Sequence, residues 1–223
     1  MQEVKESKEL TFGLYDGALV TLGLLSGLTG AGIATATLGL VGAVSVASGG
    51  LALGVVSYTA AQSHRAYTQA VYELERAEIE EHPAREKERV KEALAKKGLR
   101  GQSLREATDE ITEEKDHWAH FFVEQRFGTA PEKPMSSWLV GGITGLSYAI
   151  AGLVTLAPFF VLAQPFAIIL SALIALGVTV YAGVKKTVFT HRNPMLAGIE
   201  SATTTAIVVA VSFVVGSLLQ VFI

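Results

Sequence analysis

The chain has 223 residues, of which 50% are hydrophobic and only 17% are charged, with 22 glycines and no cysteine. This composition is typical of a membrane protein, and the missing cysteines exclude disulfides and thiolate metal sites but leave oxygen and imidazole sites open. The formal net charge of −3 argues against nucleic acid as a partner.

Five apolar segments are long enough to cross a bilayer as helices, which requires about 20 residues. With five crossings, all 18 Lys and Arg residues fall on one side, in 1–13, 62–137 and 185–195. Basic residues are retained in the cytoplasm, so we expect the N-terminus and 62–137 to be cytoplasmic, with the short stretches deciding the orientation. The predicted spans are 14–35, 38–61, 138–160, 166–184 and 196–222.

These segments predict an all-α polytopic membrane protein with five transmembrane helices and a cytoplasmic three-helix insertion between spans two and three. The predicted domains are 1–61 (N-terminal tail and first two spans), 62–137 (cytoplasmic helices) and 138–223 (last three spans). Residues 1–9 are polar and lack the pattern of a cleavable signal, so we expect the first span to be retained.

Asp16 lies inside an otherwise uncharged stretch, residues 10–40. An ionised carboxylate in hydrocarbon is costly unless it is paired, hydrated or bound to a cation, so an intramembrane acid is a functional hypothesis. Gly13 and Gly17 lie beside it and would leave its carboxylate accessible. The sequence favours a cation or proton site, and the alternative is an interfacial acid that reaches water.

Glycines recur at four-residue spacing in the first two predicted spans. Small residues at this spacing let helix backbones approach closely in lipid. The pattern predicts either packing within the chain or the seam of a dimer, and both interpretations stay open. The pairs are Gly13/Gly17, Gly23/Gly27 and Gly50/Gly54.

The charged segment 62–137 predicts a small bundle of helices. Pro83 fits the first turn of a helix, and Gly98 fits the cap at its C-terminus. Ser103 and Glu106 fit a capping box that opens the last helix, and Gly128 would end it. The predicted helices cover 67–81, 84–97 and 104–127.

Acidic and imidazole side chains gather on the last and the first of these helices. On one continuous helix, the five residues from Glu113 to Glu124 that are listed below would lie on a single stripe. Carboxylate and imidazole together suit Fe(II), Mn(II) or Zn(II), and carboxylate-rich bundles can bind paired metals. The sequence therefore predicts a metal contact, with a solvated charged face as the alternative. The sets are Glu113, Asp116, His117, His120 and Glu124, and Glu75, Glu78, Glu81 and His82.

The last three spans carry a proline and a cationic turn but no reactive motif. Pro158, near the end of the third span, predicts a bend. The chain has no phosphate-binding glycine loop, no HExxH motif and no hydrolytic triad, so we do not expect an enzyme.

Several short motifs occur in the order found in a known membrane family. The string LTFGLYDGALVTLGLLSG begins at Leu10 and places Asp-Gly at the head of a glycine-rich apolar helix. EIEEHP begins at Glu78, WAHF at Trp118 and LAPF at Leu156, and Asn193-Pro194 precedes the last span. Over nearly its whole length the chain resembles the vacuolar iron transporter family.

The resemblance implies a homodimer with a pore between the two first spans. It implies transport of Fe2+ and related divalent metals out of the cytosol in exchange for protons, with no prosthetic group. Membrane lipid and divalent cations are then the expected partners. Asp16 matches the family's pore aspartate, and Glu75, Glu78 and Glu86 match acidic metal-binding positions of its soluble domain.

The chain departs from the family pattern where ligands are expected. The family has a Glu and a Met in the second span, where this chain has Ser45 and Leu53. In the soluble domain, family Glu positions fall at Arg89 and near Arg126, and an apolar pair that usually contains Met becomes Phe122-Val123.

These departures keep three hypotheses open. The first is a transporter of Fe2+ or Mn2+ that uses Asp16. The second is a non-transporting, membrane-anchored metal-sensing or docking protein. The third is a transporter of another solute.

Overall fold

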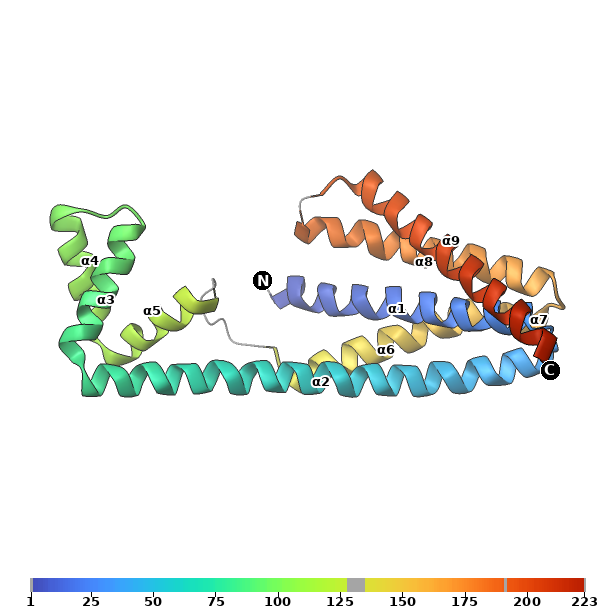
Figure 1. Cartoon of the computed structure of the whole chain (residues 1–223), viewed down its shortest axis with the longest axis horizontal. Helices are drawn as coiled ribbons and strands as arrows, with labels where there is room; N and C mark the ends of the chain where they lie inside the picture. The colour runs from blue at the N-terminus through green and yellow to red at the C-terminus, as the bar shows by residue number, and fades with distance from the viewer. Residues whose placement is uncertain (1, 128–134, 191, 223) are drawn as a thin grey trace. The chain divides into compact units, whose positions relative to one another are not determined.

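The computed structural model describes residues 2–127, 135–190 and 192–222, and all regular secondary structure within these ranges is helical (Figure 1). The predicted all-α fold is therefore confirmed. The chain forms two compact units. The membrane unit comprises Met1–Thr59 and Met135–Ile223, and the insertion unit comprises Ala60–Pro134.

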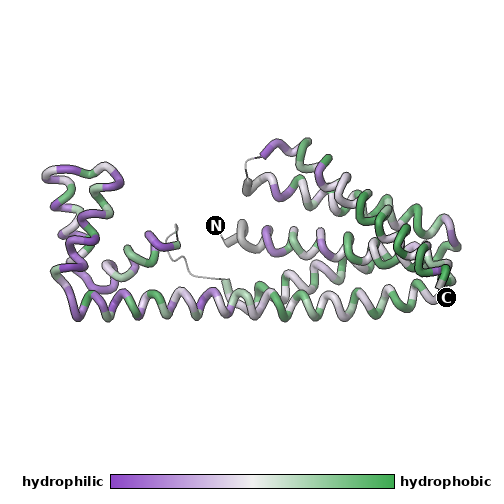
Figure 2. The backbone as a smooth tube through the Cα atoms, in the orientation of Figure 1, coloured by the Kyte–Doolittle hydropathy of each residue, from purple (hydrophilic) through white to green (hydrophobic). Residues whose placement is uncertain are grey.

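Within the described residues, five helical stretches are long and apolar enough to cross a membrane, which confirms the predicted number of spans. Hydrophobic residues dominate the tube along α8 and α9 in Figure 2. The first stretch begins at Ser7 rather than at residue 14, so it also contains Glu9. The five stretches are Ser7–Gly30, Thr35–Glu81, Ser137–Val161, Phe166–Thr187 and Pro194–Leu219.

Helices α1, α6, α8 and α9 pack together in the membrane unit. Helix α6 ends at Leu156 and the short helix α7 begins at Pro158, whose nitrogen has no hydrogen to donate, and Ala157 between them keeps a helical backbone conformation. The bend expected at Pro158 stays a prediction. The long helix α2 contributes residues to both units. The bounds are α1 Gln2–Gly30, α2 Thr35–Glu81, α6 Ser137–Leu156, α7 Pro158–Val161, α8 Phe166–Thr190, α9 Pro194–Leu219 and the 3-10 helix η1 Gln220–Phe222.

Glycines bring the helices of the membrane unit into backbone contact. A Cβ atom added to Gly17 would lie 2.2 Å from the carbonyl oxygen of Tyr148 on α6, and one added to Gly216 would lie 1.7 Å from that of Gly27. On α2, a Cβ at Gly50 would lie 3.0 Å from the carbonyl oxygen of Gly145. These glycines therefore pack helices within one chain, as the first of the two interpretations predicted.

Buried hydroxyl groups join the same helices. Thr179 on α8 and Thr205 on α9 form a hydrogen bond of 2.9 Å between their Oγ1 atoms. Ser171 on α8 donates to the carbonyl oxygen of Thr155 on α6 at 2.7 Å. Such bonds satisfy polar groups that hydrocarbon cannot solvate and add to the packing between helices.

The insertion unit comprises the end of α2 and three further helices around a small apolar core. Pro83 occupies the first turn of α3, and Gly98 follows that helix with φ of +99°, so both predicted helix boundaries are confirmed. Gly128 lies outside the described residues. The helices are α3 Pro83–Lys96, α4 Gly101–Glu113 and α5 Lys115–Phe127, and the buried core residues are Ile79, Val90, Leu94, Trp118, Ala119 and Phe122.

The single helix predicted over 104–127 is wrong, because the chain breaks at Glu114 with φ −113° and ψ 126°. On one straight helix, Leu104 and Phe122 would lie about 27 Å apart. The break lets both side chains pack on the same core. The predicted capping box is also wrong: α4 begins at Gly101, and its first residues form no side-chain cap.

Candidate functional site

Asp16 lies on a face of α1 that the rest of the membrane unit leaves partly uncovered. Gly13 and Gly17 press α1 against α6, and Asp16 itself is half-buried beside this contact. One turn before and one turn after it, on the same stripe of the helix, Phe12 is 52% exposed and Val20 is 44% exposed. Asp16 therefore lies between the contact with α6 and a partly exposed stripe of an apolar span.

Glu9 is a second acid in the same span, although it lies outside the span predicted from the sequence. It lies two turns before Asp16, on the same side of α1, and its Oε2 accepts a hydrogen bond of 3.3 Å from Thr144 on α6. The seven-residue spacing to Asp16 was the available signal. The predicted span begins at residue 14, which leaves Glu9 outside it.

The second span supplies no acid or thioether to this region. Ser45 and Leu53, where metal ligands were expected by resemblance, are both half-buried on α2. The carbonyl oxygen of Ser45 accepts a hydrogen bond from Ser48 at 3.2 Å. Of the strong metal-binding side chains, the membrane unit thus offers carboxylates on α1 and, at Glu200, on α9, and none on the apolar part of α2.

The three acids Glu75, Glu78 and Glu86 lie close together in the insertion unit and are paired with arginines. Glu86 is fully buried and accepts from Arg85 Nε at 3.0 Å and from Arg89 Nη1. Arg85 also pairs with Glu78. The hydrogen bond to Glu86 raises the pKa of Arg85 above its ordinary value, although desolvation opposes this change.

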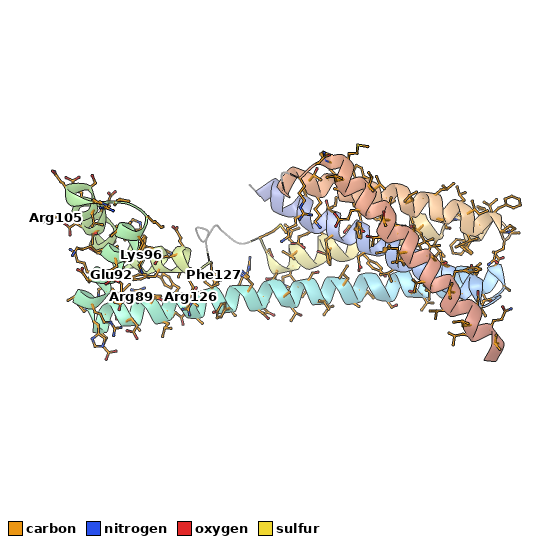
Figure 3. All side chains as sticks on the ribbon, turned by 45° about the horizontal axis from the view of Figure 1, so that its top comes forward. Arg89, Glu92, Lys96, Arg105, Arg126 and Phe127 are labelled. Carbon is orange, nitrogen blue, oxygen red and sulfur yellow. The ribbon has the colours of Figure 1, made fainter. Side chains whose placement is uncertain are left out.

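Glu75 is the buried acid on the α2 side of this cluster. Its Oε2 accepts from Arg89 Nη1 at 3.3 Å, and its Oε1 lies 3.9 Å from Arg126 Nη1. Arg89 and Arg126, on α3 and α5, are labelled in Figure 3. A pocket of about 310 Å³ is lined by Glu75, Arg89, Phe122, Gln125 and Arg126.

The residues expected on one stripe are divided between two helices. Glu113 ends α4, whereas the other four lie on α5. Asp116 accepts a hydrogen bond of 2.9 Å from the hydroxyl of Tyr72 and pairs with Arg76 at 3.3 Å. The ring of His120 lies 4.9 Å from that of Tyr72, His117 lies 3.6 Å from Glu114, and Glu124 is half-buried.

Within the described part of the chain, no three His, Asp or Glu side chains converge on a point that could hold a metal ion. Three acids of the insertion unit, Glu75, Glu86 and Asp116, face arginine and tyrosine donors instead. The metal-binding roles of Asp16, of the three glutamates and of the α4–α5 residues stay predictions.

Comparison with known proteins gives one consistent result. The sequence profile of the VIT family matches residues 7–217. Vacuolar iron transporter 2 of Oryza sativa subsp. japonica is 26% identical over 207 residues, which cover 92% of this chain and 84% of that protein. Vacuolar iron transporter 1 of Tulipa gesneriana is 27% identical over 216 residues (96% and 87%), and vacuolar iron transporter 1 of Arabidopsis thaliana is 24% identical over 214 residues (96% and 86%).

Proposed function

Because the chain belongs to the VIT family, we propose that it carries Fe2+ or Mn2+ out of the cytosol. It is a multi-pass integral membrane protein and not an enzyme. Its relatives support the general function of a membrane transporter of metal ions. Iron as cargo is suggested by the names of those relatives. The distribution of basic residues supports a cytoplasmic N-terminus and insertion unit.

The observation that carries the proposal is the position of Asp16. A carboxylate in an apolar span is stabilised when a cation occupies its surroundings. Phe12, Asp16 and Val20 form a partly exposed stripe on α1, and a second copy of the chain can cover this stripe. In such a homodimer two Asp16 carboxylates flank one path, and a divalent cation between them neutralises both.

The same pair of acids provides a route to proton exchange. When the cation leaves, the two carboxylates repel each other across a medium of low dielectric constant. Binding a proton removes that repulsion. Metal movement in one direction and proton movement in the other then follow from one pair of Asp16 side chains.

A second candidate is the non-transporting, membrane-anchored docking or metal-sensing protein. Ser45 and Leu53 favour it, because the second span then adds no strong ligand to a metal path. In this case Asp16 would serve packing or dimer formation only.

Uptake into sealed vesicles distinguishes the two candidates. Purified full-length protein is reconstituted, and Mn2+ and the internal pH are followed with two dyes. We expect Mn2+ entry to be faster than in protein-free vesicles and to be coupled to proton exit. Mn2+ entry equal to that of protein-free vesicles, in protein shown to be folded, would favour the non-transporting candidate.

A further inference from the structure

Arg89 lies between the two buried acids of the insertion unit, Glu75 and Glu86. Its Nη1 donates to Glu86 and, at 3.3 Å, to Glu75, so one guanidinium joins an acid of α3 to an acid of α2. Its guanidinium carbon lies 4.3 Å from the centre of the Phe122 ring on α5. Arg89 thus contacts an acid of its own helix α3, an acid of α2 and an aromatic ring of α5, through two ion pairs and one cation–π contact.

Two further arginines complete the charge balance. Arg85 pairs with Glu78 and Glu86, and Arg126 approaches Glu75 at 3.9 Å. Three guanidinium groups therefore face three carboxylates. Glu86 has no exposed surface and the side chain of Glu75 is 10% exposed, so neither acid exchanges its arginine partners freely for water.

We propose that Arg89 is the resident cation of the insertion unit and that, with Arg126, it excludes divalent metal ions from Glu75 and Glu86. The two arginines are then residues that determine specificity, because they hold carboxylates that would otherwise attract a metal ion.

Geometry and charge both support this exclusion. A bound divalent ion needs several carboxylate oxygens within about 2.0–2.6 Å of one point. Here the oxygens of Glu75 and Glu86 are directed to Arg89, and the adjoining pocket carries Arg89 and Arg126 on its wall. A metal ion placed there would be repelled by two fixed positive charges at short range.

A consequence, which rests on the proposed transport, is that metal ions reach Asp16 without first binding to Glu75 and Glu86. Metal binding to the insertion unit can be measured without any flux measurement. A failure of the proposed exclusion is therefore distinguishable from a failure of the proposed transport.

Trp118 provides a local probe of metal binding. It is 5% exposed and packs in the core of the insertion unit with Phe122, and the chain has only one other tryptophan, Trp138. In the full-length protein carrying Trp138→Phe, we expect Mn2+ up to millimolar concentration to give no saturable change in Trp118 fluorescence. In Arg89→Glu, which removes one cation and adds one ligand, we expect a saturable change with a Kd at least about tenfold below the millimolar limit of that titration.

Arg105→Glu is the matched control, because Arg105 is an exposed arginine on α4 outside the cluster. It should leave the titration unchanged. Circular dichroism checks that each variant is helical, and Arg89→Gln serves as the second variant if Arg89→Glu does not fold. Saturable Mn2+ binding by the parent protein that is lost in Glu86→Gln would overturn the proposal. If folded Arg89→Glu and Arg105→Glu show the same change of Trp118 fluorescence with Mn2+ concentration, the proposal is overturned as well.

Discussion

The Asp16→Asn variant is expected to lose Mn2+ uptake by more than about tenfold. A pair of unit charges about 4 Å apart in a medium of effective dielectric constant about 20 interacts by about 4 kcal/mol. Since about 1.4 kcal/mol corresponds to a factor of ten, loss of even part of this attraction exceeds tenfold in cation occupancy. Asparagine keeps the size of the side chain and removes only its charge. The initial rate of Mn2+ entry into vesicles measures the effect.

Glu200→Gln is the matched control for this experiment. Glu200 is an exposed acid in the apolar helix α9, and its replacement makes the same change from acid to amide. We expect its uptake rate to equal that of the parent protein. If Asp16→Asn transports as fast as Glu200→Gln, Asp16 has no part in the transport path.

Gly216→Ala is expected to lower the melting temperature of the protein in detergent by several degrees or to prevent folding. The new Cβ atom would lie 1.7 Å from the carbonyl oxygen of Gly27, which belongs to the backbone of α1 and cannot rotate away. Helices α1 and α9 would have to separate, and overpacking of this kind costs about 1–3 kcal/mol or more. Thermal unfolding followed by circular dichroism measures the change.

Gly177→Ala tests whether this effect comes from the helix contact. Nothing lies within 4 Å of a Cβ atom added to Gly177 on α8, so this variant keeps its stability or gains a little from reduced backbone freedom in the unfolded chain. Equal melting temperatures for Gly216→Ala and Gly177→Ala would contradict the close approach of α1 and α9.

Local features of the fold could be predicted because each depends on a few neighbouring residues. Apolar length indicated five spans, and Pro83 and Gly98 marked the ends of α3. The glycine spacing predicted close helix approach but left open whether the partner was the same chain. That choice depends on contacts such as Gly216 with Gly27, which are far apart in sequence.

The charge partners of the candidate site could not be predicted in the same way. A pattern of acids on a helix is compatible with metal, water or arginine as the counter-charge. Arg89 and Glu75 are 14 residues apart but lie on different helices, so their pairing at 3.3 Å depends on how α3 packs against α2. The turn at Glu114, which separates Glu113 from the histidines, likewise depends on packing around Trp118 and Phe122.

Cross-linking between copies tests most directly whether two Asp16 side chains flank one path. The chain has no cysteine, so single replacements Asp16→Cys and, as control, Ala18→Cys, which is fully buried within one copy, introduce unique thiols. With a short bifunctional thiol reagent in intact membranes, the account predicts a covalent dimer for Asp16→Cys and none for Ala18→Cys. An Asp16→Cys protein that stays monomeric while its thiol reacts readily with a single maleimide would contradict it.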